Sequence, residues 1–408
     1  MSELIKILVL PSDTSGIGKY RSLDPHIYLN NHYSNEFFVD IVFDNVENVN
    51  FNDYHIIHFH KRLVRGKDTE WQVSKIKEIQ KGGSKVVMDV DDYWLLPNGH
   101  PLQKSYKDNG YSKNQLSLLR SVDYVTTTTP IFASKLKSIG IKNVIVIENS
   151  IDPEEKQFKG ETKKTDKLRI GWLGGSSHLH DLELLGDFVQ KNSDINDKLQ
   201  YVICGFDTRG TVTEINPQTG EEKQRDILPH ETVWARYEEI FTTNYKTIDD
   251  DYKKFLLEFK EGEYNSGNNL PYVRVWTKPV TTYAMNYSKF DISLAPIKNH
   301  IFNVMKSQLK VIEAGFYKKA LIASEIGPYT IDLVHCLKNG EFNEEGNAIL
   351  IPEGRNHSDW SKAIKKLVQN PEMIKVLGER LYNTVKDKYD LNVVTKNRAE
   401  FYKSLINK

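Results

Sequence analysis

The chain has 408 residues, of which 39% are hydrophobic and 27% are charged, a composition typical of a soluble globular protein. Lysine and arginine together number 55, as do aspartate and glutamate, so the formal net charge is zero. This balance argues against a protein that coats nucleic acid, and the lack of any apolar run approaching ~18 residues argues against a membrane-spanning helix. The length favours two or three domains, or one large two-lobed enzyme.

The two cysteines, Cys204 and Cys336, lie in apolar stretches, and the sequence has no CxxC or Cys/His spacing typical of a metal site. We therefore expect two buried thiols rather than a disulfide. The N-terminal LIKILVL is too short and too charged for a signal peptide. Together these features predict a cytoplasmic protein. Peripheral association with the inner membrane stays open, although no basic amphipathic helix stands out.

The first half of the chain alternates strands and helices, a pattern typical of one doubly wound α/β domain with about six strands. LIKILVL is predicted as a buried first strand because it is rich in leucine and β-branched residues. The later strands are FFVDIVF, YHIIHFHK, SKVVMDV, DYVTTTT and NVIVIENSID. The helix WQVSKIKEIQK ends at two glycines, a common C-terminal stop.

The loop after the first strand, SDTSGIGKYR, contains Gly16 and Gly18 followed by Lys19 and Arg21. Glycine lets the backbone approach a ligand closely, and the two cations suit phosphate or carboxylate. A GxG without a third spaced glycine is a weak dinucleotide signal. The open interpretations are a Rossmann-type cofactor loop, a ligand-facing loop of another kind, which we favour, and a plain turn.

Polar residues also mark the carboxyl ends of two predicted strands. In YHIIHFHK, His58 and His60 share one face, and His60 would point into a crevice as a base or as a hydrogen-bond donor to a sugar hydroxyl. The alternative is a structural histidine. VVMDVDD ends in Asp89, Asp91 and Asp92, a cluster that is costly because like charges repel. It suits substrate contact, a metal, or a cap of the next loop, and Asp91 is the candidate catalytic or acceptor-binding group.

Residues 153–167 are polar and charged, and we predict that they form a linker. The strand Leu168–Leu173 then restarts the pattern and runs into two glycines, two serines and a helix start. Such a turn is a stronger anion cradle than the first one, suited to a diphosphate or a sugar, with a mere tight turn as the alternative. The residues predicted to contact this diphosphate or sugar are Gly174, Gly175, Ser176 and His178.

From about residue 208 to 278 the pattern is interrupted, and we interpret this segment as an insertion in the second domain. TVTEINPQTGEEKQR predicts a hairpin with a PQTG turn, and DDDYKKFLLEFKEGEYN predicts a polar helix. The insertion would serve acceptor choice or self-association, or would be a solvated decoration.

A strand–loop–helix–strand unit follows, made of FDISLAPI, the helix of KSQLKVIEAG, and KALIASEIG. Ligands of parallel sheets bind at the carboxyl ends of the strands, so the loop after Pro296 and the helix start should face a ligand. Lys306, Ser307, Gln308 and the free N–H groups of the helix start suit a diphosphate. Glu313 would lie on the same helix face as Lys306. The alternative is a surface helix with an ordinary Lys/Glu pair.

Over nearly the whole chain these segments resemble retaining glycosyltransferases of the GT-B architecture, in particular the large family-four group. The resembling segments are SGIGKYR, DYHIIHFH, VVMDVDD, TTTTPIFASKLKSIG, VIVIENSID, IGWLGGSSHLHDL and, most specifically, FNVMKSQLKVIEAGFYKKALIAS. The resemblance implies two Rossmann-like domains facing each other across a cleft, and no metal or other cofactor. Its expected parts are an acceptor domain at 1–152, the linker at 153–167, a nucleotide-sugar domain at 168–386, and a helix at 387–408 that packs back on the first domain.

The resemblance also suggests roles for single residues. The paired glutamates of the family would fall on Met305 and Glu313, so Glu313 alone would hold the ribose, and Lys310 matches a lysine often found before it. The Arg and Lys that neutralise the diphosphate in the family are replaced by SSHLHD, so Lys306, with His178 as a further candidate, would take their part. The predicted catalytic residues are His60, Asp91, Lys306 and Glu313. The further predicted donor-binding residues are Asn303, Ser307, Gln308 and Lys310.

The resemblance implies metal-independent transfer of a hexose or related sugar, with retention, from a nucleoside diphosphate donor to an acceptor hydroxyl. The acceptor would be a glycan, a lipid-linked molecule or another hydroxyl compound, and the neutral charge does not favour nucleic acid. The alternatives are a nucleotide-sugar epimerase of the same architecture, a non-catalytic nucleotide- or sugar-binding protein, and a single-domain glycosyltransferase with a DxD metal site.

Overall fold

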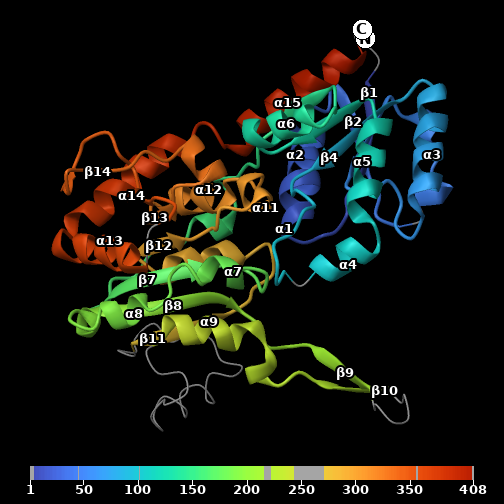
Figure 1. Cartoon of the computed structure of the whole chain (residues 1–408). Coiled ribbons are helices and arrows are strands. Elements are labelled where there is room, and N and C mark those ends of the chain that lie inside the picture. The colour runs from blue at the N-terminus through green and yellow to red at the C-terminus, as the bar shows by residue number, and fades with distance from the viewer. Residues whose placement is uncertain are drawn as a thin grey trace.

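The computed structural model describes residues 4–44, 46–100, 102–215, 222–242, 271–354 and 357–406. Within them the chain forms two α/β units, each with a six-stranded parallel sheet flanked by helices (Figure 1). The prediction of two doubly wound Rossmann-like domains is therefore confirmed.

The first sheet has the strand order β2-β1-β3-β4-β5-β6. The chain reverses its direction of travel across the sheet between β1 and β3, which is where ligands of such sheets bind. The strands are β1 (Ile5–Leu10), β2 (Phe37–Ile41), β3 (Ile56–His60), β4 (Lys85–Val90), β5 (Tyr124–Thr127) and β6 (Val144–Val146). The helical segments are α1 (Gly16–Gly18), the π-helical η1 (Lys19–Leu23), α2 (Asp24–His32), α3 (Thr69–Lys81), α4 (Gln103–Asp108), α5 (Tyr111–Ser121) and α6 (Pro130–Ser138).

The second sheet has the order β11-β8-β7-β12-β13-β16, the Rossmann order, with the reversal between β7 and β12. Its strands are β7 (Leu168–Leu173), β8 (Leu199–Phe206), β11 (Tyr272–Trp276), β12 (Ile292–Ala295), β13 (Ala320–Ser324) and β16 (Ile349–Ile351). Its helices are α7 (Leu179–Leu182), α8 (Phe188–Lys191), α9 (Val233–Phe241), the 3₁₀ segment η8 (Tyr283–Lys289), α11 (Ile301–Val304), α12 (Leu309–Phe316), α13 (His357–Gln369) and α14 (Glu372–Val385). A short hairpin joins β14 (Leu337–Lys338) and β15 (Glu341–Phe342).

The segment expected as an insertion, about 208–278, contains two regular parts of the second domain, because β11 is the edge strand of its sheet and α9 packs on β8. The described part that stands outside these layers is the antiparallel hairpin of β9 (Thr211–Ile215) and β10 (Glu222–Asp226), which projects from the domain (Figure 1). The predicted PQTG turn and the predicted helix in DDDYKKFLLEFKEGEYN lie outside the described residues.

The last helix, α15 (Leu391–Ile406), lies against α2 of the first domain (Figure 1). The Tyr402 hydroxyl is 2.8 Å from His58 Nδ1 on β3, and Lys403 forms an ion pair with Glu36. The helix therefore returns from the second domain and ties its end to the first.

The hydrophobic cores of the two domains each take a residue from the other. Tyr20 of η1 packs in the main cluster of the second domain, and Met305 packs in the cluster of the first. Cys204 and Cys336 are buried free thiols, as predicted. Within the described part of the chain, no helix combines the length and the apolar character that crossing a membrane requires.

Candidate functional site

A cavity of about 1130 Å³ opens between the two domains. It is lined by the loops that follow β1 and β4 of the first sheet and β7 and β12 of the second, so it lies at the carboxyl ends of both sheets and at the reversal point of each. A cavity between two domains is a common location for a small-molecule site. The predicted site residues that line it are Gly16, Arg21, Asp91, Gly174, Gly175, Ser176, His178, Lys306, Ser307, Lys310 and Glu313.

The turn after β7 is closely packed and needs its glycine at Gly174. A Cβ atom there would lie 2.4 Å from the Trp172 ring. The neighbouring Gly205, at the end of β8, has φ +98°, and a Cβ on it would lie 2.2 Å from the carbonyl oxygen of Gly174. Gly175 by contrast faces open space. The backbone at this turn is therefore free to come close to a ligand.

Tyr237 of α9 braces the same turn from behind. Its hydroxyl donates to the Gly175 carbonyl at 3.2 Å and accepts from the His178 backbone N–H at 2.9 Å. His178 Nδ1 lies 2.9 Å from Asp181 Oδ2, and burial together with Lys306 lowers the pKa of His178 to about 3. His178 is therefore neutral at pH 7 and contributes no charge to the cavity.

Asn303 does not line the cavity. Its side chain is buried and donates to Asp181 Oδ1 at 2.7 Å and to the Lys298 carbonyl at 2.9 Å. It therefore supports the His178–Asp181 pair from behind. Gln308 is also buried, and its Nε2 donates to the Tyr389 hydroxyl at 2.6 Å. Both residues were predicted to bind the donor, and in this structure both bind protein groups instead.

Two lysines bring positive charge into the cavity without a carboxylate partner among the described residues. Lys306 Nζ lies 4.6 Å from the centre of the Phe302 ring. Lys310 Nζ lies 5.1 Å from the Trp172 ring and donates to the Leu173 carbonyl. Burial and the nearby Lys306 lower the pKa of Lys310 to about 7. An anion bound here would favour the charged form of Lys310 and raise its pKa again.

Glu313, on α12, is 4% exposed and lies among three tyrosine hydroxyls. Tyr283 and Tyr20 donate to Oε1, the latter at 3.4 Å, and Tyr287 donates to Oε2 at 3.0 Å. Burial raises the pKa of Glu313 to about 8, so the carboxyl group is protonated at neutral pH when the cavity holds no ligand. Tyr20 comes from the first domain, so this cluster also joins the domains.

The loop after β1 uses its glycines differently. Gly16 lines the cavity, and a Cβ on it would meet its nearest atom at 4.0 Å, whereas a Cβ on Gly18 would lie 1.7 Å from the Asp13 carbonyl oxygen. Gly18 is therefore required for packing. Lys19 forms ion pairs with Asp24 and, at 2.9 Å, with Glu155. Its charge holds the loop to the segment after β6 rather than facing the cavity.

Arg21 is 1% exposed and binds Asp89 through two hydrogen bonds, Nε to Oδ2 at 2.9 Å and Nη2 to Oδ1 at 2.6 Å. Thr126 donates to the same carboxylate at 2.6 Å. Burial disfavours the charge of Asp89, but the Arg21 guanidinium outweighs it and holds the pKa of Asp89 well below its usual range. Arg21, predicted as a cation of the acceptor-side loop, is thus neutralised in a buried ion pair with Asp89.

His60 and Asp91 are brought together, as a pair. His60 Nε2 lies 2.9 Å from Asp91 Oδ1, and its Nδ1 lies 2.6 Å from Ser12 Oγ. Lys61 Nζ lies 2.8 Å from Asp91 Oδ1. Burial disfavours ionisation, but Lys61 and His60 outweigh it and hold the pKa of Asp91 below its usual range. Asp91 is therefore an ionised hydrogen-bond acceptor at the cavity, with His60 fully buried behind it.

Among the described residues, no group of three or more His, Cys, Asp or Glu side chains is arranged to hold a metal ion. The sequence offered the carboxylates of the DVDD segment as alternative metal ligands. In the structure they face cations of the chain: Asp89 faces Arg21, and Asp91 and Asp92 face Lys61.

Several residues that line or support the cavity could not be found by sequence reasoning. Tyr237 and Tyr283 are single aromatic residues without a local motif, although Tyr20 stands inside the GIGKYR loop. Asn149 donates to Ser307 Oγ at 3.0 Å across the domains, a contact between residues far apart in the sequence.

No protein-family model and no curated protein matches this sequence. Solved structures do match. A glycosyltransferase from Rickettsia africae ESF-5 has a TM-score of 0.62 at 14% identity and covers 99% of each chain. Anabaena Alr3699/HepE in complex with UDP and glucose has a TM-score of 0.61 at 10% identity, over 98% of this chain and 100% of that one. An α-glucosyltransferase in complex with UDP and a mismatched 13-mer DNA has a TM-score of 0.57 at 13% identity, over 98% and 99%. The likeness establishes a GT-B fold for the whole chain.

Proposed function

We propose that the protein transfers a sugar from a nucleoside diphosphate donor to an acceptor hydroxyl. The observation that carries the proposal is the arrangement of Lys306 and Lys310, two lysines without a carboxylate partner in the described chain, beside Gly174 and Gly175 in the interdomain cavity. The structures of HepE with UDP and glucose and of the α-glucosyltransferase with UDP share this fold and support the choice of donor class.

The lysines would act on the leaving group. As the bond between the sugar and the diphosphate breaks, negative charge develops on the diphosphate oxygens, and fixed positive charge in a partly dry cavity stabilises it. Lys306 and Lys310 supply that charge, with the N–H groups of the turn at Gly174 and Gly175. Glu313 would accept hydrogen bonds from the ribose hydroxyls, which would take the place of its tyrosine donors.

We further propose that the reaction proceeds with retention and without a metal. Retention requires the acceptor hydroxyl on the sugar face that the diphosphate leaves. Asp91, ionised by its contacts with Lys61 and His60, would accept a hydrogen bond from that hydroxyl. Metal independence is supported by the chain's own cations, since lysines supply charge to the donor side and the DVDD carboxylates already face Arg21 and Lys61.

The test is thermal shift and donor hydrolysis with a panel of nucleoside diphosphates and their sugars, with and without EDTA. Binding raises the melting temperature by mass action. We expect a shift with one nucleotide that EDTA leaves unchanged and that Lys306→Ala weakens, while the exposed Lys137→Met on α6 leaves it unchanged. A shift that EDTA abolishes would overturn metal independence, and no shift with any nucleotide would overturn the proposed function. The anomeric proton coupling of the product, measured by NMR, decides retention.

A further inference from the structure

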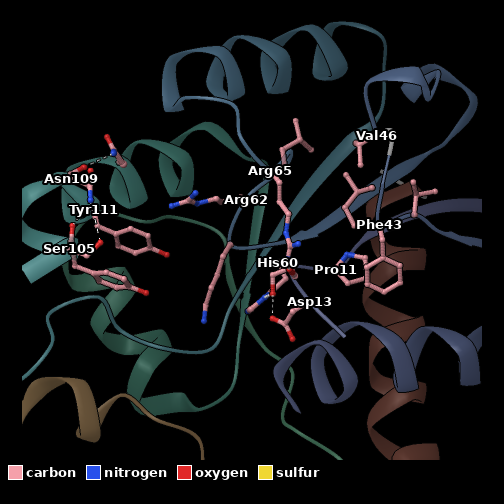
Figure 2. Close-up of a pocket in the computed structure, with 17 residues that line it drawn as sticks. Pro11, Asp13, Phe43, Val46, His60, Arg62, Arg65, Ser105, Asn109 and Tyr111 are labelled. Carbon is pink, nitrogen blue, oxygen red and sulfur yellow. Dashed lines mark hydrogen bonds between the residues drawn. The ribbon is translucent and has the colours of Figure 1, made fainter. Parts of the chain in front are cut away.

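A second cavity, of about 680 Å³, lies in the first domain at the carboxyl ends of β1 and β3 (Figure 2). Three residues, Lys61, Tyr106 and Tyr111, line both this cavity and the interdomain one. The two cavities are therefore neighbours, and the second borders Asp91, which contacts Lys61. A molecule in the second cavity would extend toward the place where the acceptor hydroxyl is expected.

Positive charge is concentrated in this cavity. Arg62, Arg65 and Lys61 all line it (Figure 2 labels the two arginines). Arg65 donates to the Ser12 carbonyl, and the Arg62 guanidinium lies 5.8 Å from the centre of the Tyr111 ring. Within the described chain neither arginine has a carboxylate partner at ion-pair distance. The carboxylate in the lining, Asp13, is occupied by hydrogen bonds from Ser12 and Ser15 and from backbone N–H groups.

The backbone that carries Arg62 is held in an unusual conformation. Lys61 has φ +60°, a region that residues other than glycine rarely adopt, and the Arg62 N–H donates to the His60 carbonyl at 2.7 Å. A three-residue turn of this kind is strained, and it persists only where its surroundings hold it. Here the ion pair of Lys61 with Asp91 holds the turn. The turn places Lys61 at the interdomain cavity and the next residue, Arg62, at the second cavity.

The wall opposite β1 is aromatic and polar. The rings of Tyr106 and Tyr111 are stacked at 4.0 Å with an interplanar angle of 20°, and Asn109 and Asn114 lie beside them. Tyrosine and asparagine offer donors and acceptors to hydroxyl groups, and the planar guanidinium of arginine pairs with carboxylate or phosphate oxygens through two hydrogen bonds. The combined lining suits a hydroxyl-rich molecule that carries an oxyanion.

We propose that the second cavity binds an anionic saccharide as the acceptor, with its phosphate or carboxylate on Arg62 and Arg65. This inference rests on the proposed function and adds the chemical class of its acceptor. A nucleic-acid acceptor is disfavoured because the formal net charge is zero, which gives a polyanion no general attraction, whereas two arginines that line one cavity suit a small anionic molecule.

The test is a calorimetric titration of the full chain with glucose 6-phosphate, glucuronate, glucose and a short single-stranded oligonucleotide. We expect the two anions to bind at least tenfold more tightly than glucose, in a salt-dependent way. Arg62→Met and Arg65→Met should each remove most of that preference. Lys137→Met removes one exposed positive charge elsewhere on the domain and should change nothing. The phosphate and the carboxylate arms distinguish which oxyanion fits better.

Equal affinity for glucose and glucose 6-phosphate would overturn the proposal, as would unchanged affinity in both arginine variants. Tighter binding of the oligonucleotide, lost in the arginine variants, would overturn it in favour of a nucleic-acid acceptor. Competition by inorganic phosphate on the unmodified protein gives a second readout if a variant fails to fold: displacement of glucose 6-phosphate is expected, and none would contradict the oxyanion site.

A parallel titration with UDP and other nucleoside diphosphates separates the two proposals. If the protein binds a nucleotide but does not prefer the anionic saccharides over glucose, the acceptor assignment is wrong and the proposed function is unaffected. If the protein binds the anionic saccharide but no nucleotide, the proposed function is wrong and the oxyanion site in the second cavity is retained.

Discussion

Single residues of the cavity carry charge states that binding would change, and Lys310 is the clearest case. Burial and Lys306 lower its pKa to about 7, and a bound diphosphate would raise that pKa again. Nucleotide binding above pH 7 should therefore take up a proton. Since the terminal phosphate is already mostly ionised there, affinity should fall by up to about tenfold per pH unit between pH 7.5 and 9.

The measurement is the nucleotide dissociation constant as a function of pH, with proton uptake followed by calorimetry in two buffers. Lys310→Arg keeps its charge over this range and should flatten the profile. Parallel profiles for the two proteins would show that Lys310 does not titrate in this cavity.

Glu313 gives a pH-dependent prediction for stability. Its folded pKa is raised from 4.5 to about 8, so stability from this group is fully present below pH 4.5 and is lost as pH rises toward 8. Glu313→Gln removes the titration while keeping the shape. Without nucleotide, the variant should gain at least ~1 kcal/mol of unfolding free energy relative to the unmodified protein between pH 5 and pH 8. Glu344→Gln, an exposed change, is the control, and a difference that stays constant with pH would contradict the prediction.

Arg398 is buried on α15 close to the Tyr402 hydroxyl, and it forms no ion pair with a carboxylate in the described structure. Burial, followed by Arg398, lowers the pKa of His58 to about 3. A buried charge without a carboxylate partner is costly, so Arg398→Met should stabilise the protein by about 1–3 kcal/mol. Chemical denaturation measures this, with the exposed Lys396→Met as control. NMR should also show a higher pKa for His58. A destabilised variant would mean that an anion or water satisfies Arg398.

Some predicted site residues are bound by partners that lie far away in the sequence. Lys19 and Arg21 beside two glycines, and Gln308 beside Lys306, have the composition of a phosphate site. Arg21 instead binds Asp89, 68 positions away, and Gln308 binds Tyr389, 81 positions away. A local motif shows which cations and amides are present. Only the fold shows which of them a distant partner already occupies.

At the scale of the element, the alternation of strands and helices was enough to predict both sheets, because a buried parallel strand is an almost continuous apolar run. The insertion was predicted less well. β11 is an edge strand and α9 belongs to the helix layer, yet both lie beside a polar hairpin whose composition dominates the segment. Strand order, which joins β11 to β8, depends on pairing over a long distance and is not visible in local periodicity.

The loop between β1 and α2 gives a prediction with a built-in control. A methyl group on Gly18 would collide with the Asp13 carbonyl oxygen, whereas one on Gly16 would meet no atom closer than 4.0 Å. Gly18→Ala should therefore destabilise the protein by about 1–3 kcal/mol or more, and Gly16→Ala should be nearly neutral. Thermal denaturation of both variants decides this. Equal effects would mean that the loop can shift as a unit.

At the scale of the whole molecule, the two domains hold each other through exchanged residues. Tyr20 reaches from the first domain to Glu313, and Asn149 reaches to Ser307. Met305 inserts in the other direction, into the apolar cluster of the first domain, and is 5% exposed. The cavity is thus built by residues of both domains, and its Lys306 and Glu313 side cannot be understood from the second domain alone.

The packing of Met305 is consistent with the absence of a glutamate at this position, where the family that the sequence resembles has one. The side chain does not line the interdomain cavity here and packs instead among apolar groups of the first domain. Met305→Glu should therefore not restore a nucleotide contact. It would bury a carboxyl group without a partner and should lower the unfolding free energy by at least ~2 kcal/mol. Met305→Leu, which conserves volume, should cost less than ~1.5 kcal/mol.

Denaturation together with nucleotide titration distinguishes the two outcomes for Met305→Glu. A destabilised protein with unchanged or weaker nucleotide affinity would mean that this interface excludes the position from the donor site. A gain in affinity at little cost in stability would mean that the domains open enough for the carboxylate to reach the cavity. In that case the contacts of Tyr20 and Asn149 would describe one of two arrangements of the domains.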